Sequence, residues 1–110
     1  MAKVKLKIKH VVDNIEENYI VYAIKTDNKY FYTYDNSKFT IQKENQKISI
    51  KLTNDITHEI FFEQNSSYGI IDKKFSYEIK LINLKILDKI IEIDYKIDSI
   101  NKFVLDEVND

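Results

Sequence analysis

The segment IKLINLKILDKIIEIDYKI, residues 79–97, decides between an all-β fold and a fold that ends in a helix. Isoleucine recurs along it at steps of three or four residues, at positions 79, 82, 86, 90, 93 and 97, which is the spacing of a helical stripe. A helix on that stripe would be built from β-branched isoleucine without any alanine. Residues 91–97 also alternate strictly between apolar and polar side chains, as a half-buried strand does. Two strands that meet at a turn over residues 88–89 are therefore favoured, and a C-terminal helix is the alternative.

The apolar positions change phase once within this region. Apolar side chains occupy every odd position from 75 to 81 and then the even positions 84 and 86. A slip of one residue moves an apolar set to the opposite face of a sheet. One extra residue near Ile82 and Asn83 would absorb the slip and bend the strand. The sequence therefore predicts a β-bulge at this point.

Shorter alternating runs fill the rest of the chain. Strands are expected at residues 3–9, 18–26, 29–35, 38–42, 46–53, 57–64, 75–81, 91–97 and 103–105. Pairs that contain Asn or Asp interrupt the runs at residues 27–28, 35–36, 45–46, 54–55 and 65–66, and such regular turn signals are typical of antiparallel sandwiches and barrels. Because the chain has a single glycine, Asn and Asp are expected to supply the positive φ angles of its turns.

The composition agrees with an all-β fold. Ile, Val, Thr, Tyr and Phe, which favour strands, account for 44 of the 110 residues. A chain of this length is expected to form one domain, over residues 1–110. About eight to ten strands leave two exposed edges unless the sheet closes on itself. We therefore predict a single antiparallel β-barrel, whose interior holds its own side chains or one small ligand.

Composition and charge also exclude several classes of function. Without cysteine the chain has no disulfide, no catalytic thiolate and no cysteine-ligated metal. All 17 basic residues are lysine and the net charge is -1, which argues against nucleic-acid binding, although an AT-rich genome would also explain the missing arginine. The lysine-interrupted N-terminus does not resemble a signal peptide, and no apolar stretch is long enough to span a membrane. A cytoplasmic protein is therefore expected.

Tyrosine is the main candidate for contacts with a ligand. Tyr30, Tyr32 and Tyr34 share one face of an expected strand. Their rings and hydroxyls could orient a molecule at the mouth of the barrel, or they could simply pack across strands. The ligand-lining set predicted from the expected inward faces is Tyr22, Tyr32, Tyr34, Tyr77 and Tyr95.

No catalytic or metal-binding constellation stands out. No serine lies in a glycine-flanked nucleophile motif, and the carboxylates at positions 16, 17, 78 and 94 are expected to be solvated. The only histidines, His10 and His58, lack the spacing of a metal motif and are expected to be hydrogen-bonded or solvent-facing. The four lysines at positions 3, 5, 7 and 9 could meet an acidic surface, but they would also protect a terminal strand from edge pairing. The chain is therefore predicted to be a non-enzyme that needs no metal or cofactor.

The single glycine of the chain, Gly69, does not fall in an obvious hairpin turn. It follows Tyr68 and precedes the run that begins at Phe75. In a chain that makes its other turns without glycine, this one implies a need of the backbone: a positive φ, a kink, or the close approach of a strand or an aromatic ring. Tyr68 and Gly69 are therefore predicted to be structural residues.

Residues 61–69, FFEQNSSYG, followed by residues 75–79, FSYEI, resemble part of a bacterial protein family. Residues 91–97, IEIDYKI, and the aromatic run FYTYD at residues 31–35 resemble it too. The family is the YwiB-like group of uncharacterised small barrels with a lipocalin-like (calycin-like) fold, and the resemblance extends from Lys3 to Val108. The chain departs from the family pattern at Ser67, where proline is usual, and in its glycine-free turns. The resemblance implies a lipocalin-like barrel and no assigned activity.

Three functions are consistent with this sequence. The first is a barrel that binds a small, partly apolar ligand inside or at its mouth. The second is a structural or interaction module, for example a homodimer, that uses an exposed strand or an aromatic patch. The third and least favoured is an OB-like barrel that binds nucleic acid. The first is preferred because residues 18–26 are apolar on both faces and because tyrosines occupy the expected interior.

Overall fold

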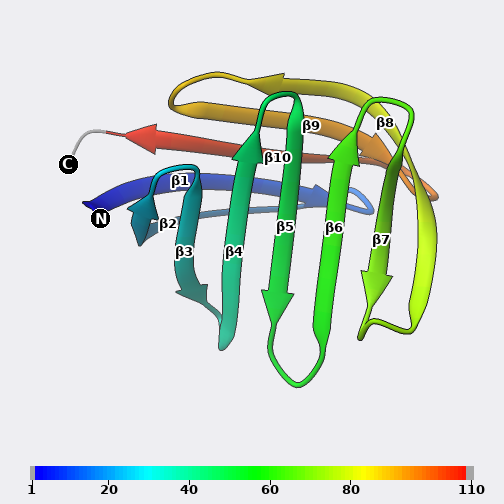
Figure 1. The fold of residues 1–110 in the computed structure, drawn as a ribbon, viewed down its shortest axis with the longest axis horizontal. Coiled ribbons are helices and arrows are strands. Elements are labelled where there is room, and N and C mark those ends of the chain that lie inside the picture. The colour runs from blue at the N-terminus through cyan, green and yellow to red at the C-terminus, as the bar shows by residue number, and fades with distance from the viewer. Residues whose placement is uncertain (1, 109–110) are drawn as a thin grey trace.

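Almost every alternating run of the sequence forms a strand. The computed structural model describes residues 2–108, which form ten strands and no helix, so no helix in this range is long and apolar enough to cross a membrane (Figure 1). The strands are β1 (Ala2–Val12), β2 (Ile15–Thr26), β3 (Lys29–Tyr34), β4 (Ser37–Glu44), β5 (Lys47–Thr53), β6 (Thr57–Glu63), β7 (Ser67–Ile71), β8 (Phe75–Ile86), β9 (Ile90–Lys96) and β10 (Ile100–Val108). Each strand pairs antiparallel with its neighbours in sequence, and β1 pairs with β10 to close the barrel. The prediction of a single all-β antiparallel barrel is confirmed.

Residues 79–97 form the end of β8 and all of β9, so the alternative of a C-terminal helix is wrong. The predicted bulge is present, because the pairing of β8 with β9 shifts between Leu81 and Asn83. The isoleucines with helical spacing do not share a face: Ile93 is buried, whereas Ile82 is half exposed. A strand that alternates by two and slips once by one residue places isoleucines at steps that imitate a helix.

The predicted turn pairs all lie between strands. Positive φ angles occur, as expected, at Asp and Asn residues, namely Asp13, Asn14, Asp27, Asp35, Asn36, Asn65 and Asp72. Gln46 and Lys73 also adopt a positive φ. The alternating pattern does not predict the turn at residues 13–14, because residues 10–17 do not alternate strictly. It does not predict β7 either, because that strand is short and contains the glycine.

The strands of the barrel form two layers that cross each other (Figure 1). Figure 1 shows β3 to β7 running side by side in the front layer, with β1, β9 and β10 crossing behind them. β8 passes from one layer to the other, and its bulge near Ile82 provides the bend. At the opposite corner β2 leads into β3 through a ladder of only three residue pairs, Ile24–Phe31, Lys25–Tyr30 and Thr26–Lys29. β2 and β3 therefore diverge beyond this corner.

The interior is filled largely by the chain's own side chains. The buried hydrophobic residues are Leu6, Ile8, Ala23, Tyr30, Tyr32, Ile41, Ile48, Ile50, Phe62, Ile79, Ile91, Ile93, Tyr95, Phe103 and Leu105. One end of the barrel, the terminal end, holds the start of β1, the end of β10 and the turns at residues 27–28, 45–46, 64–66 and 87–89. The other, the distal end, holds the turns at residues 13–14, 35–36, 54–56, 72–74 and 97–99. The two ends differ in chemistry.

Candidate functional site

A charged network closes the terminal end. The Glu107 carboxylate accepts hydrogen bonds from the Lys25 ammonium at 2.9 Å and from the Tyr30 hydroxyl at 3.0 Å. The Lys43 ammonium lies 5.8 Å from the centre of the Tyr30 ring and donates a hydrogen bond to the Asp88 carbonyl at 2.6 Å. Partial burial opposes ionisation of Glu107, but the hydrogen bonds from Lys25 and Tyr30 outweigh it and lower the pKa of this carboxyl group. These contacts tie β2, β3, β4 and β10 together.

The distal end instead contains a small, partly open cavity of about 80 Å³. Its lining residues are His10, Glu17, Tyr19, Phe39, Ile50, Leu52, His58, Ile60, Phe62, Tyr95 and Phe103. The wall is mostly apolar, and two imidazoles, one carboxylate and two phenol hydroxyls interrupt it. Apolar walls with a few converging polar groups are the usual form of a small-molecule site.

Each of the two histidines shares a hydrogen bond with a tyrosine. His10 Nε2 lies 3.3 Å from the Tyr95 hydroxyl, which links β1 to β9. His58 Nε2 lies 2.5 Å from the Tyr77 hydroxyl, which links β6 to β8. Among residues 2–108 no buried side-chain nitrogen or oxygen lacks a hydrogen-bond partner. The two pairs therefore hold the imidazole rings in defined orientations around the cavity.

Burial favours the neutral form of these groups. Desolvation lowers the pKa of His10, and the charge of Glu17 opposes that effect in part. Desolvation also lowers the pKa of His58. It raises the pKa of Tyr95 to about 12. At neutral pH the two histidines and this tyrosine therefore offer the cavity uncharged donors and acceptors.

Aromatic side chains fill the space where β2 and β3 diverge. The Tyr19 and Tyr34 rings stack with their centres 3.6 Å apart, and the Tyr19 hydroxyl lies 3.2 Å from that of Tyr32. The Tyr32 ring stacks in turn on Phe39, with centres 4.8 Å apart. Side-chain contacts thus replace backbone pairing at this corner, and Tyr19 and Phe39 also form part of the cavity wall.

Of the five tyrosines predicted to line a ligand site, Tyr95 lies on the cavity wall. Tyr32 and Tyr77 face the interior but reach the cavity indirectly, through the hydroxyl contacts with Tyr19 and His58. Tyr34 is half-buried, and its contact with the wall is the stack on Tyr19 described above.

The prediction that Tyr22 faces inward is wrong. Its side chain is 50% exposed on the outer face of β2, where it pairs in register with Lys5. Residues 18–26 are apolar on both faces, so alternation does not indicate which face is buried. The face that contains Val21 and Ala23 packs against the core instead.

The absence of a side chain at Gly69 makes room for the Tyr77 ring. The two residues are paired across β7 and β8, and a Cβ atom on Gly69 would collide with that ring. Gly69 does not have a positive φ, so the close approach of an aromatic ring is the predicted need that the structure shows. Tyr68 points to the outer face and stacks on Phe61, with ring centres 4.9 Å apart.

Sequence reasoning missed the part of the cavity wall that His10, Glu17, Tyr19 and His58 form. His10 and His58 belong to distant strands, and their spacing does not indicate that they approach one cavity. A usable signal exists once the strand order is known. In an up-and-down barrel, inward residues next to alternate turns gather at the same end, and all four residues lie close to distal turns.

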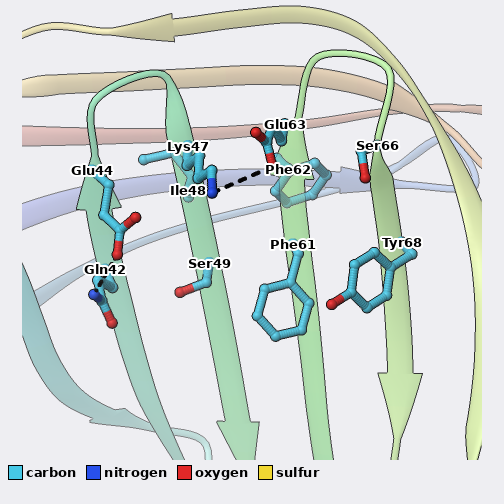
Figure 2. A pocket seen from close by; sticks show the side chains of 10 residues that line it. All are labelled: Gln42, Glu44, Lys47, Ile48, Ser49, Phe61, Phe62, Glu63, Ser66 and Tyr68. Atoms are coloured by element: carbon cyan, nitrogen blue, oxygen red, sulfur yellow. Dashed lines mark hydrogen bonds and ion pairs between the residues drawn. The ribbon is translucent and has the colours of Figure 1, made fainter.

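A second hollow lies on the outer face of the front layer, over β4 to β7 (Figure 2). There the stacked rings of Phe61 and Tyr68 lie beside an ion pair between Lys47 and Glu63 at 3.6 Å. Its volume of about 430 Å³ exceeds that of the distal cavity, but it is somewhat more open to solvent, its lining is less apolar, and its charged groups Lys47 and Glu63 pair with one another. The distal cavity, whose mostly apolar wall holds both histidines, is therefore the candidate site.

The described part of the chain contains no cluster of side chains that could form a metal site. Among residues 2–108 no group of three or more His, Cys, Asp or Glu side chains is placed to hold a metal ion. Comparisons of the chain with protein-family models, with curated proteins and with solved structures found no match. The chemistry of the cavity therefore has to be argued from its own residues.

Lowering the pH should destabilise the barrel through its two histidines. The pKa values of His10 and His58 are lower in the folded state than the ordinary value of 6.5, so the unfolded chain binds more protons than the folded chain as the pH falls below that value. The stabilisation is complete above the unfolded pKa and is lost as the pH falls toward the folded values. Urea unfolding should show a lower midpoint at about pH 5.5 than at about pH 7.5.

The double variant His10→Gln/His58→Gln is the control for this effect. Glutamine can still hydrogen-bond to Tyr95 and Tyr77 but does not titrate. The unfolding midpoint of the variant should change less between the two pH values than that of the unmodified protein. An equal change in both proteins would assign the pH dependence to other groups.

Proposed function

We propose that the protein is a non-enzymatic barrel that binds a small, uncharged, partly apolar molecule in the distal cavity. The observation that carries this proposal is the convergence of His10, His58 and Tyr95 on one small and otherwise mostly apolar cavity. The imidazoles and the hydroxyl would orient a polar group of the ligand. Its apolar part would pack against aromatic walls such as Phe62 and Phe103.

The volume of the cavity limits the size of the ligand. A volume of about 80 Å³ is far below the roughly 300–1,000 Å³ of sites for drug-sized molecules. It is also smaller than an engineered apolar cavity of about 150 Å³ that holds benzene in another protein. The ligand proposed here is therefore a molecule of a few non-hydrogen atoms. A larger ligand would require the stacked rings of Tyr19 and Tyr34 to move apart.

Small probe molecules test this proposal directly. Propan-2-ol and acetamide at millimolar concentration should shift the amide NMR signals of cavity residues and raise the melting temperature. Leu52→Phe, which places a larger side chain on the cavity wall, should abolish these shifts. Lys51→Phe changes the exposed neighbour on the same strand and should preserve them. Signals that do not move with any probe, or that move equally in both variants, would contradict the proposal.

The assignments to the YwiB-like family, to its lipocalin-like fold and to the cytoplasm stay predictions. At Ser67, where that family usually has proline, the hydroxyl donates to the Glu63 carbonyl at 2.8 Å and accepts from the Glu63 amide at 3.0 Å. Serine at this position therefore makes two hydrogen bonds to the Glu63 backbone that a proline side chain could not make. An OB-like nucleic-acid binder receives no support from the fold, because ten strands in up-and-down order differ from a five-stranded Greek-key barrel.

A further inference from the structure

One edge of β2 is available for contact with another strand. β2 pairs with β1 from its start, but its ladder with β3 begins only at Ile24. Within the described part of the chain, residues 15–21 therefore have a neighbouring strand on one side only. Figure 1 shows β3 turning away from β2 at this corner. We call residues 15–21 the open edge.

Every second residue of the open edge directs its backbone N–H and C=O groups away from β1, within the plane of the sheet. Val12 and Ile15 flank a two-residue turn, so the odd-numbered residues of β2 direct their N–H and C=O groups to β1. The even-numbered residues Glu16, Asn18 and Ile20 direct theirs to the open edge. The partner that such backbone groups recognise is another extended strand.

The open edge lacks most of the features that prevent strand addition. It contains no proline and no glycine, and its pairing with β1 shows no bulge. Its charged residues, Glu16 and Glu17, lie at its beginning, and the Ile20 side chain is 58% exposed. The lysines at positions 3, 5, 7 and 9 belong to β1, one strand further from the edge. They therefore do not block the approach of another strand to β2.

The distribution of charge along the open edge indicates which strand would pair with it. On the outer face its beginning carries Glu16, which pairs with Lys9 of β1 at 3.6 Å, whereas Glu17 faces the distal cavity. The later part of β2 lies beside Lys7 and Lys3, which are in register with Ile20 and Ile24. Antiparallel pairing of two such edges brings Glu16 of each copy toward the lysines that lie one strand behind the later part of β2 in the other copy. A second copy of this chain has this complementarity, and a two-fold arrangement pairs both identical edges at once.

We propose that the protein forms a homodimer in which two open edges pair antiparallel about a two-fold axis at Tyr19. Asn18 then exchanges backbone hydrogen bonds with the partner's Ile20, and the partner's Asn18 does the same with Ile20. The strands β1 and β2 of both copies form one continuous sheet. This dimer is independent of the ligand proposed for the distal cavity, so either proposal can fail alone.

Sedimentation velocity over a range of concentrations tests the association. The mass should rise from 13.2 kDa to about twice that value as the concentration increases. Ile20→Pro removes an N–H that faces the open edge and not β1, so it should give a folded monomer. The double variant Asn18→Lys/Ile20→Lys should do so as well, because like charges would then face each other. Ile100→Lys, at an exposed position of β10, is the matched control and should remain dimeric.

Cysteine cross-linking tests the register. The chain contains no cysteine, and Tyr19 would lie directly opposite the partner's Tyr19 in a non-hydrogen-bonded pair. The Cα separation in such a pair is about 4.5 Å, which a disulfide can bridge. Tyr19→Cys should therefore form a covalent dimer on mild oxidation, whereas Thr33→Cys on β3 should not.

Three results would overturn the homodimer: a monomer at every concentration, a dimer that the edge variants leave intact, or cross-linking at position 33 in preference to 19. If the monomer instead binds an added extended peptide, the open edge would be assigned to a foreign strand.

Discussion

Replacing Gly69 with valine is expected to lower the melting temperature of the barrel by about 10–20 °C. The valine side chain would occupy space that the Tyr77 ring fills, so either the ring or the strand has to move. Overpacking of this kind costs about 1–3 kcal/mol, and displacing Tyr77 from His58 would add about 1 kcal/mol for the lost hydrogen bond. A loss of about 2–4 kcal/mol corresponds to that temperature shift in a domain of roughly this size. Differential scanning calorimetry would measure it.

The same substitution in a Tyr77→Ala background is the control. Without the ring, a valine at position 69 has room and should cost little, because β-branched residues favour strands. The destabilisation caused by Gly69→Val should therefore be much smaller in that background than in the unmodified protein. Equal losses in both backgrounds would mean that the ring of Tyr77 is not the reason for the glycine.

Much of this fold follows from alternation. The turn pairs, the bulge after Leu81 and the all-β architecture could be predicted because each depends on neighbouring residues in the sequence. The orientation of Tyr22 could not, since both faces of its strand are apolar and only the packed barrel decides which one is buried. Local pattern therefore predicts strands more reliably than it predicts which side of a strand faces the core.

The candidate site depends on relations that the sequence does not display. His10 and His58 meet around one cavity only because the end of β1 and the start of β6 both lie near the distal turns. For Gly69 the sequence predicts a positive φ, a kink or the close approach of a neighbouring group. Only the position of the Tyr77 ring across the β7–β8 ladder decides among these three causes. The cavity volume is a small difference between the space the barrel encloses and the side chains that fill it, so composition does not determine it.

Phe62→Ala is expected to destabilise the protein by about 3–5 kcal/mol, the usual cost of truncating a buried phenylalanine. The Phe62 side chain is 1% exposed, and its ring centre lies 4.9 Å from that of Tyr95. Removing the ring takes away this contact and leaves space that a closed sheet can only partly collapse into. Urea unfolding monitored by circular dichroism would measure the loss, on the assumption of two-state behaviour.

Phe61→Ala is the matched control, because Phe61 is the preceding residue on the same strand and points to the outer face. Its main aromatic contact is the stack on Tyr68, and it is only half-buried. Truncating it should cost about 0.5–1.5 kcal/mol for the ring contact, plus a small loss of buried area. Similar losses at positions 61 and 62 would mean that the barrel interior is not the dominant source of stability.

The Phe62→Ala variant also tests how the cavity limits the ligand. Phe62 lines the distal cavity of about 80 Å³, so its truncation should enlarge that space enough to admit benzene, which the unmodified cavity is too small to hold. Saturating benzene should then raise the melting temperature of Phe62→Ala, by binding only the folded state, and should leave the unmodified protein and Phe61→Ala unchanged. A benzene shift in the unmodified protein would show that the cavity already expands in solution, and the size limit argued for the natural ligand would no longer hold.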